Sequence, residues 1–576
     1  MIGLSQNIMR KTSILLILWY FGEIVFCQTS KLDNRESEPF NPSSETKIET
    51  GLYANKEVNQ ATQNSFSTAL SFTSSNLPIF IIDTENNQKI PDEPKITANL
   101  GIIYNGSGIR NNISDPPDHY NGYIGIELRG NSTQHYPKKP YGIETRDAQG
   151  ENLNVSLLGM PEENDWVLRA SYFDHTFIRN PLADHMSRLT GRWASRCRLV
   201  ELVLNGEYQG IYICMEKLKR DRNRLDIARL ESYEISEPDI SGGYIYEITG
   251  FEDNLGESRY LKYPKFYEAA PQQIAYIRQY DNNFRNVMRS GYYMDEVLGY
   301  NAWINVESFV DELLVQEAMR NSDAYGWSGY FHKDRNGKIC AGPVWDFDQS
   351  AGNSSYPDDG IIDGWMFNHE HTNNTPFFWS KLWEDPVFKF KVRQRWENLR
   401  EDAFKTENLI AYIDSIAYLL SEAQQREFEK WPVLGEYIWR ETTGYDQRDT
   451  YKKEVDYLKY FLIQRWIWMD TQLAQIPNPN PAAINMKQIL DDILVYPNPA
   501  KDFLIFDINS RKTAVAFINI YNHLGILVHS TALFDLNQGT NSHSLKLDKL
   551  NQPGVYLYKV IINNELGCTG RFIKIN

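Results

Sequence analysis

The sequence predicts an α+β protein: an antiparallel β-rich first part, a helical second part and a small all-β sandwich at the C-terminal end. Runs of strand type joined by turn residues dominate up to about residue 250. Longer segments then carry large apolar residues at helical spacing, and a Pro/Asn-rich segment at 476–481 separates them from short alternating strands. At 576 residues the chain has room for more than one hydrophobic core.

The first residues have the pattern of a secretory signal peptide. Arg10 and Lys11 precede a short apolar run at 14–21, and cleavage is expected near residue 27. That run is too short to span a membrane comfortably, and no other stretch of the mature chain is long and apolar enough. Residues 28–75 are rich in Ser, Thr, Asn, Gln and Glu, so we expect a disordered linker.

The charge balance argues against a nucleic-acid partner. The chain has 59 basic and 75 acidic residues, a net charge of −16, and nothing in it resembles a nucleic-acid-binding module. The cysteines beyond the leader match no zinc-binding spacing. Cys197 and Cys214 could pair across adjacent strands or remain free thiols, and the sequence leaves both open.

The β-rich part, from residue 76, contains a turn that could hold a phosphate. Between the expected strands 123–129 and 141–145, the segment from Arg129 to Lys139 includes Gly130 and Ser132 and ends in Lys138-Lys139. Free backbone N–H groups beside Arg and Lys are typical of phosphate sites. A surface hairpin with solvated lysines would have the same sequence. Glu216 ends a second predicted hairpin, where it either orients a lysine or belongs to an ordinary charge pair.

Residues 308–353 predict a helix, a polar turn, a β-hairpin and an acidic turn. The helix ends near Arg320, and Asn336-Gly337 is the turn that a tight hairpin favours. Asp323 and the pair Asp346/Asp348 flank this hairpin, so their carboxylates should be neighbours. Carboxylates sharing one site raise each other's pKa unless a cation is present, and oxygen ligands favour hard ions such as Mg²⁺. An Asp-x-Asp surface turn is the alternative, but the flanking Trp345 and Phe347 favour a partly buried site.

Two helical blocks follow, at 376–431 and 452–475, whose aromatic residues we interpret as core. Residues 476–493 read as a stiff linker. Beyond them, residues 494–576 predict an immunoglobulin-like β-sandwich, because short strands alternate with turn residues at regular intervals.

Residues 76–475 resemble the CotH family of atypical secreted kinases. The matching motifs occur in order along the segment: Arg129-Gly130-Asn131-Ser132 with Lys138-Lys139, Asp165-Trp166, Arg179-Asn180, Asn205-Gly206-Glu207-Tyr208-x-Gly210 with Glu216, Asn321-x-Asp323, and Gly342-Pro343-x-Trp345-Asp346-Phe347-Asp348 followed by Gly352-Asn353. The last motif is the most specific. The resemblance implies a kinase-like core with a β-rich N-lobe and a helical C-lobe.

The resemblance also implies roles for these residues in phosphoryl transfer from ATP with Mg²⁺ or Mn²⁺. Asp323 would be the catalytic base or orient the acceptor, and Asp346 would hold the metal, helped by Asn321 and Asp348. Arg129, Gly130 and Ser132 would cover the nucleotide, and Lys139 or Lys138 would contact its phosphates with Glu216 as the orienting carboxylate. The acceptor would be a protein, this chain itself included. The glycine turn departs from G-x-G-x-x-G in having one glycine.

The C-terminal unit resembles the type A sorting domain of the type IX secretion system. The matching residues are Tyr496-Pro497-Asn498-Pro499-Ala500, Tyr521-x₃-Gly525, Gly554-Val555-Tyr556 and Arg571-Phe572-Ile573-Lys574. The resemblance implies export by that machinery from a bacterium of the Bacteroidota type, and a product that is secreted or attached to the outer-membrane surface.

The main alternative is a non-catalytic adhesion or scaffold protein at the cell surface, built on a kinase-like fold. Extracellular ATP is scarce, which favours this alternative, whereas the presence of both Asp323 and Asp346 favours the kinase. A metal-dependent phosphodiesterase is a third reading, but the histidines that such sites usually recruit are missing around Asp346/Asp348.

Overall fold

The fold is taken from a computed structural model, which describes residues 72–249, 253–369, 375–479, 490–522, 526–550, 552–562 and 565–575. The expected signal peptide, and the expected linker as far as residue 71, lie outside the described residues. Two short segments that we assigned to linkers are strands instead. Residues 74–75 form β1 (Ser74–Ser75), which pairs with β4 (Asn111–Asn112), and residues 490–493 belong to β14 (Leu490–Tyr496).

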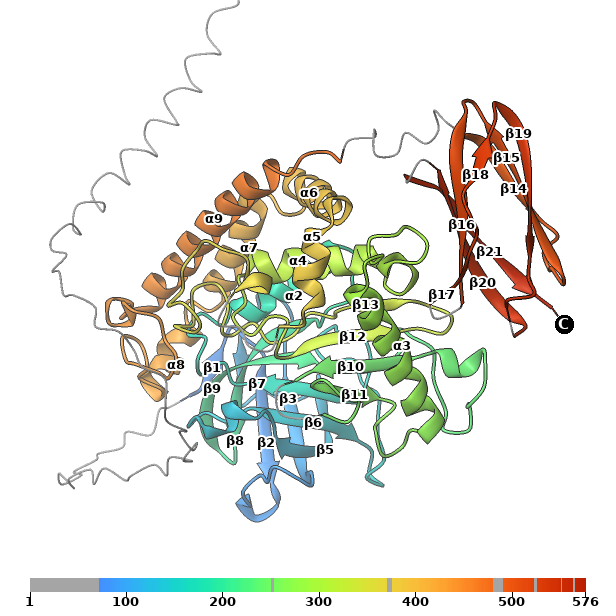
Figure 1. The fold of residues 1–576 in the computed structure, drawn as a ribbon. Coiled ribbons are helices and arrows are strands. Elements are labelled where there is room, and N and C mark those ends of the chain that lie inside the picture. Colours follow the sequence, from blue (N-terminus) through green and yellow to red (C-terminus); the bar gives the residue numbers. More distant parts are fainter. Residues whose placement is uncertain are drawn as a thin grey trace, which may run out of the picture. The chain divides into compact units, whose positions relative to one another are not determined.

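The β-rich part closes into a seven-stranded barrel in the order β2-β3-β5-β6-β7-β9-β8 (Figure 1). Neighbouring strands are antiparallel except β2 and β8, whose parallel pairing closes the barrel. The expectation of an antiparallel kinase-like N-lobe is therefore corrected to a closed mixed barrel. Buried residues such as Leu100, Ile124 and Trp166 form the barrel's own hydrophobic core. Its strands are β2 (Ile79–Thr84), β3 (Ile96–Ile103), β5 (Tyr120–Leu128), β6 (Tyr141–Arg146), β7 (Asp165–Arg169), β8 (Cys197–Leu204) and β9 (Glu207–Glu216).

A second sheet has the order β11-β10-β12-β13 and is antiparallel throughout. It contains the predicted hairpin, in which Phe331 lies opposite Ala341. Asn336 has a φ of +56° in the connecting turn, a conformation that asparagine tolerates better than most residues. The strands are β10 (Tyr244–Ile248), β11 (Arg259–Tyr263), β12 (Gly329–Lys333) and β13 (Ile339–Ala341).

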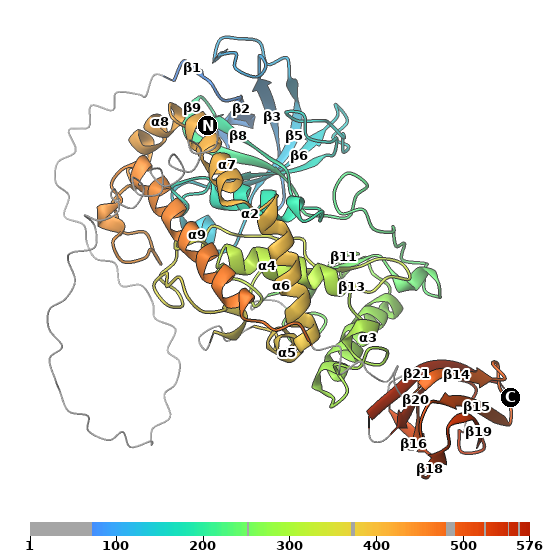
Figure 2. The same cartoon turned by 90° about the horizontal axis from the view of Figure 1, so that it is seen from above.

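The helices lie beside this sheet and beside the barrel (Figure 2), and they bury the large aromatic residues of the second part. Helix α4 (Val306–Ala318) is buried over most of its length and packs against α2, α6, α9 and β13. The Asn305 side chain caps it by accepting a hydrogen bond from the Ser308 N–H. The other helices are α2 (Arg179–Leu189), α3 (Pro271–Arg289), α5 (Phe378–Glu384), α6 (Pro386–Glu401), α7 (Thr406–Leu419), α8 (Ala423–Lys430) and α9 (Tyr451–Ala474).

The C-terminal part is all β, as predicted, with one sheet of order β14-β15-β19 and another of order β17-β16-β20-β21, to which β18 adds along β16. Its hydrophobic core, which includes Phe506, Ile518 and Phe572, is separate from those of the other parts. The strands after β14 are β15 (Phe503–Ser510), β16 (Ala514–Tyr521), β17 (Leu527–Ser530), β18 (Phe534–Leu536), β19 (Gly539–Lys546), β20 (Gly554–Ile562) and β21 (Glu565–Lys574).

Two further expectations concern membrane-spanning helices and the pairing of Cys197 with Cys214. Among the described residues, no helix combines the length and the apolar character that crossing a membrane requires. Cys197 and Cys214 are free thiols rather than a disulfide. Cys197 lies opposite Met215 in the β8–β9 pairing, while Arg198 lies opposite Cys214, so the two cysteines are offset by one position.

Candidate functional site

A cavity of about 570 Å³ gathers most of the residues that the sequence singled out. The turn after β5 contributes Arg129, Gly130 and Ser132, and the acidic turn after β13 contributes Asp346 and Asp348. Asp323, from the turn before β12, completes the acidic wall. Because the hairpin between Asp323 and Asp346 is formed, the two acidic clusters face one cavity as predicted.

Two of the three carboxylates, those of Asp323 and Asp348, are in an environment that disfavours their ionised form. Burial, reinforced by the negative charge of Asp346, raises the pKa of Asp323 to about 7, and the Arg440 guanidinium opposes this rise. Burial and the same neighbour raise the pKa of Asp348 to about 8, opposed by Arg169. Asp323 Oδ2 accepts a hydrogen bond of 3.0 Å from Gln349 Nε2. A divalent cation would relieve this repulsion, and an all-oxygen set is what Mg²⁺ or Mn²⁺ prefers.

The acidic turn is held from behind by residues of α2 and the preceding loop. Asn180 Oδ1 accepts from the Phe347 N–H at 2.8 Å, and Arg179 donates to the carbonyls of Ser350 and Ala351. Asp174 Oδ1 accepts from Arg179 Nη1 at 2.7 Å. The Arg179-Asn180 motif therefore positions the turn without lining the cavity.

Asn321, which we expected to help to hold the metal, supports the acidic turns through its side-chain amide. Its amide nitrogen donates to Gln316 Oε1 and to the Asp346 carbonyl, and its Oδ1 accepts from the Asp323 N–H. With both amide groups engaged and the side chain buried, Asn321 links the two acidic turns from behind.

Two arginines line the cavity beside the carboxylates. The guanidinium groups of Arg129 and Arg169 lie 5.1 and 5.4 Å from the centre of the Trp345 ring. Arg169 Nη1 donates to Asp346 Oδ1 at 2.6 Å. Arg129 Nη1 and Arg169 Nε are buried without a hydrogen-bond partner, so each has a donor left for an anion. Beside them Gly130 has a φ of +92°, and a Cβ there would come within 2.0 Å of Thr133 Oγ1, so this tight turn requires glycine.

The two lysines differ in their contacts, and Lys138 is the one that lines the cavity. Its Nζ donates to Glu427 Oε1 at 2.7 Å and to the Ile211 carbonyl at 2.6 Å. Lys139 instead braces its own turn through the carbonyls of Gln134 and Tyr136. Burial lowers the pKa of Lys138 and raises that of Glu427, and their pairing opposes both shifts.

Glu216, expected to orient one of the two lysines, contacts neither of them in this structure. Glu216 is buried at the end of β9, where its carboxylate accepts from Arg196 and Arg224. The carboxylate that meets a lysine is Glu427 of α8, more than 200 residues further along the chain. The sequence offered no local signal for this pair.

Strained backbone is concentrated around the cavity. Asp346 has a φ of +66°, Ser328 of +52° and Arg440 of +74°, all in the left-handed region that residues with a side chain rarely adopt. All three line the cavity. Such strain persists only where surrounding contacts impose it, and it is frequent at functional sites.

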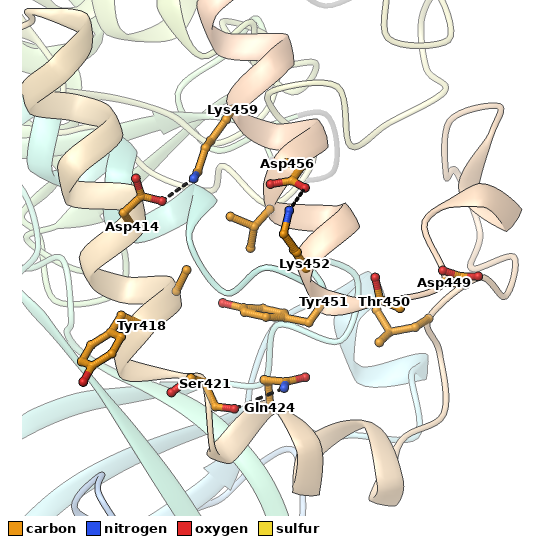
Figure 3. A pocket seen from close by; sticks show the side chains of 13 residues that line it. Asp414, Tyr418, Ser421, Gln424, Asp449, Thr450, Tyr451, Lys452, Asp456 and Lys459 are labelled. Atoms are coloured by element: carbon orange, nitrogen blue, oxygen red, sulfur yellow. Dashed lines mark hydrogen bonds and ion pairs between the residues drawn. The ribbon is translucent and has the colours of Figure 1, made fainter. Parts of the chain in front are cut away.

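Two other features contain ionisable groups. A groove of about 700 Å³ among α7, α8, α9 and the loop before α9 has its charges paired, Asp414 with Lys459 and Lys452 with Asp456 (Figure 3).

A buried cluster places His175 Nδ1 3.4 Å from Glu441 and 3.5 Å from Glu454. Arg448 also contacts Glu454. This cluster joins the segment after Phe173 to the segment after Arg440, and Phe173 and Arg440 themselves line the main cavity.

The comparisons with known proteins show which families the two parts of the chain match. The family model of the CotH kinase protein matches residues 126–469, more than half of the chain, so the protein belongs to the CotH kinase family. The model of the secretion system C-terminal sorting domain matches residues 494–575. The protein is therefore exported through the type IX secretion machinery and is secreted or held at the cell surface. No curated protein matches the chain.

Solved structures show only weak likeness. Latent PorU from Porphyromonas gingivalis is 20% identical over 15% of this chain and 9% of its own, with a TM-score of 0.14. The GH3 beta-glucosidase of Bifidobacterium adolescentis is 11% identical over 15% and 17%, with a TM-score of 0.12. The alkylpurine DNA glycosylase AlkC of Pseudomonas fluorescens is 13% identical over 34% and 54%, with a TM-score of 0.13. The chain spans little more than half of AlkC and far less of the other two.

Three residues of the site were missed from the sequence. Arg169 ends β7, Arg440 lies in the loop before α9, and Glu427 lies on α8. Arg169 follows the Asp165-Trp166 motif closely and could have been found by asking which polar residues end barrel strands. The other two lie in segments without any recognisable motif.

Proposed function

We propose that this protein transfers the terminal phosphoryl group of ATP to a hydroxyl group of a protein acceptor, either a partner or another copy of this chain. The observation that carries the proposal is the single cavity in which Asp323, Asp346 and Asp348 face Arg129 and Arg169. Phosphoryl transfer needs mainly positioning and neutralised charge, and this arrangement offers both.

The carboxylates of the cavity would bind the metal ion, and its basic residues would bind the phosphates. Asp346 and Asp348 would hold Mg²⁺ or Mn²⁺, which would supply positive charge to the phosphate oxygens. Arg129, Arg169 and the Gly130 turn would bind the phosphates, using the unpartnered Arg129 Nη1 and Arg169 Nε. Lys138 lines the same cavity, where its ammonium group is paired with Glu427.

Asp323 would act on the acceptor. In the transfer, the bond between the γ-phosphorus and the β,γ-bridging oxygen breaks, and ADP leaves. A new bond forms between that phosphorus and the acceptor oxygen, while the hydroxyl proton passes to the Asp323 carboxylate. Burial raises the pKa of Asp323, which makes its carboxylate a better proton acceptor than an exposed one.

The test is metal-dependent labelling of the purified protein with γ-labelled ATP, beside Asp346→Ala and Asp323→Asn. Asp456→Asn serves as the control, since Asp456 is half-exposed on α9 and pairs with Lys452. We expect labelling to be lost in both cavity variants and kept in the control. Labelling that survives both cavity substitutions would refute these roles. No labelling and no ATP-induced thermal shift would instead identify a non-catalytic scaffold.

A further inference from the structure

We propose that Arg440 forms a subsite for an anionic side chain of the acceptor, so that the kinase selects protein segments with Asp or Glu beside the phosphorylated residue. The inference rests on the proposed function and names its substrate class. It starts from the guanidinium of Arg440, which lines the same cavity as Asp323. Among the residues that the structure describes, no carboxylate pairs with it.

The guanidinium is held by aromatic rings. Its central carbon lies 4.3 Å from the centre of the Trp439 ring and 4.8 Å from that of Tyr356. An arginine held over aromatic rings keeps its N–H edge available, and that edge matches a carboxylate in the same plane. Trp439 is 56% exposed, so this subsite lies at the open side of the cavity, where a macromolecular acceptor can reach it.

The backbone of Arg440 is also fixed, in spite of its left-handed conformation. Its carbonyl accepts from the Ser355 N–H at 2.6 Å, and its own N–H faces the Tyr437 hydroxyl at 3.4 Å. The next residue, Glu441, is buried against His175. Three sets of contacts therefore hold one strained residue whose charged group has no partner in the described part of the chain, which is the arrangement expected of a binding residue.

The charges of the cavity separate this arginine from the phosphate-binding ones. Arg169 pairs with Asp346, on the side of the Gly130 turn. The charge of Arg440 acts on Asp323, the residue assigned to the acceptor hydroxyl, and both line the cavity. An anion bound at Arg440 would therefore belong to the acceptor rather than to the nucleotide.

Steady-state transfer to two synthetic peptide sets tests the proposal. Each peptide carries Ser, Thr or Tyr, flanked by Glu in one set and by its neutral isostere Gln in the other. We expect the wild-type protein to show a KM about tenfold lower for the Glu set, as a charged hydrogen bond predicts. Arg440→Gln should abolish this preference and leave the KM for ATP unchanged. Arg222→Ala, which removes a 74% exposed arginine outside the cavity, is the control.

These experiments distinguish failure of the Arg440 subsite from failure of the proposed kinase activity. A Glu preference that persists in Arg440→Gln, or a higher KM for ATP instead, would overturn the acceptor subsite while leaving the kinase intact. Binding of a fluorescent Glu-flanked peptide, followed by anisotropy without ATP, needs no transfer. If that binding is lost in Arg440→Gln but no peptide is ever phosphorylated, the subsite stands and the kinase proposal fails. If the peptide does not bind and none is phosphorylated, both fail.

Discussion

At the scale of single residues, the buried pair of Lys138 and Glu427 has a large energetic consequence. Both side chains are almost completely buried, and Phe177 and Tyr212 place their rings about the lysine at 5.0 and 4.9 Å. Glu427 Oε2 also accepts from the Ile211 N–H at 2.6 Å. Removing one partner of such a pair leaves the other charge buried and uncompensated.

We therefore expect Lys138→Met to lower the free energy of unfolding by roughly 3–5 kcal/mol, because the Glu427 carboxylate remains buried alone. Chemical denaturation measures this loss. Lys138→Met combined with Glu427→Gln should recover much of it, since the charge that causes the cost is then absent. If the two substitutions simply add, the two residues do not act as a pair.

A second residue-scale prediction concerns pH. Burial raises the pKa of Glu312 on α4 to about 7, although Gln316 Nε2 donates to it at 2.8 Å. Because the folded-state pKa lies above that of the unfolded chain, the stability that this group contributes is complete below about pH 4.5 and is lost as the pH rises through about 7.

Glu312→Gln should accordingly raise the free energy of unfolding by up to about 3 kcal/mol at pH 8 and change it little at pH 4.5. Thermal melts at the two pH values measure the difference. Glu307→Gln, at a 67% exposed position of the same helix, should not reproduce the gain at pH 8. An equal gain at both pH values would show that the effect does not arise from Glu312 ionisation.

At the scale of elements, the contact between β9 and α8 depends on a glycine. Gly210 has a φ of +96°, and a Cβ there would lie 2.1 Å from Glu427 Oε2. Gly206, in the turn before β9, has a φ of +75° but would place its Cβ in open space. Both glycines therefore have a left-handed backbone conformation, but only at Gly210 would a Cβ atom also collide with a neighbouring side chain.

We expect Gly206→Ala to cost about 1 kcal/mol, from backbone strain alone. Gly210→Ala should cost clearly more and weaken ATP binding as well, because Glu427 must move away from Lys138. Denaturation curves and the ATP-induced thermal shift of the two variants provide the comparison. Equal losses in both would mean that the close approach of α8 to β9 is not needed.

The elements also explain which parts of the fold and of the site could be predicted from the sequence alone. The hairpin, α4 and the acidic turn were predictable, because apolar spacing, Asn336-Gly337 and the flanking aromatic residues act within a few positions of one another. Closure of the barrel could not be predicted from local sequence, because it depends on the parallel pairing of residues 79–82 with residues 201–204, which are far away along the chain. The same difference explains which site residues the sequence predicts. Asp323, Asp346 and Asp348 could be predicted as neighbours because a single hairpin brings them together. Glu427 could not be predicted as the partner of Lys138, because it comes from a distant part of the chain.

At the scale of the whole molecule, the separate hydrophobic cores indicate that the sorting domain is a folding unit distinct from the part that contains the cavity. The core of the C-terminal part is formed by residues between Ala500 and Phe572, and Leu504, Phe506 and Phe572 are fully buried within it. A part that buries its own apolar surface can fold by itself. The sorting domain should therefore direct export without contributing to the site.

Deletion of residues 494–576 should leave the ATP-induced thermal shift unchanged and stop the protein from reaching the cell surface or the medium in a host with type IX secretion machinery. Fractionation of the host cells, with the protein followed by antibody, measures the second effect. Phe572→Asp should block export to a similar degree, because a buried charge unfolds the sorting domain while the rest of the chain keeps its sequence. Val555→Asp, at a 44% exposed position of β20, tests a surface change in the same domain and should be exported normally. Export of the deleted chain would show that residues outside the sorting domain direct secretion, and loss of the thermal shift would show that the domain contributes to nucleotide binding.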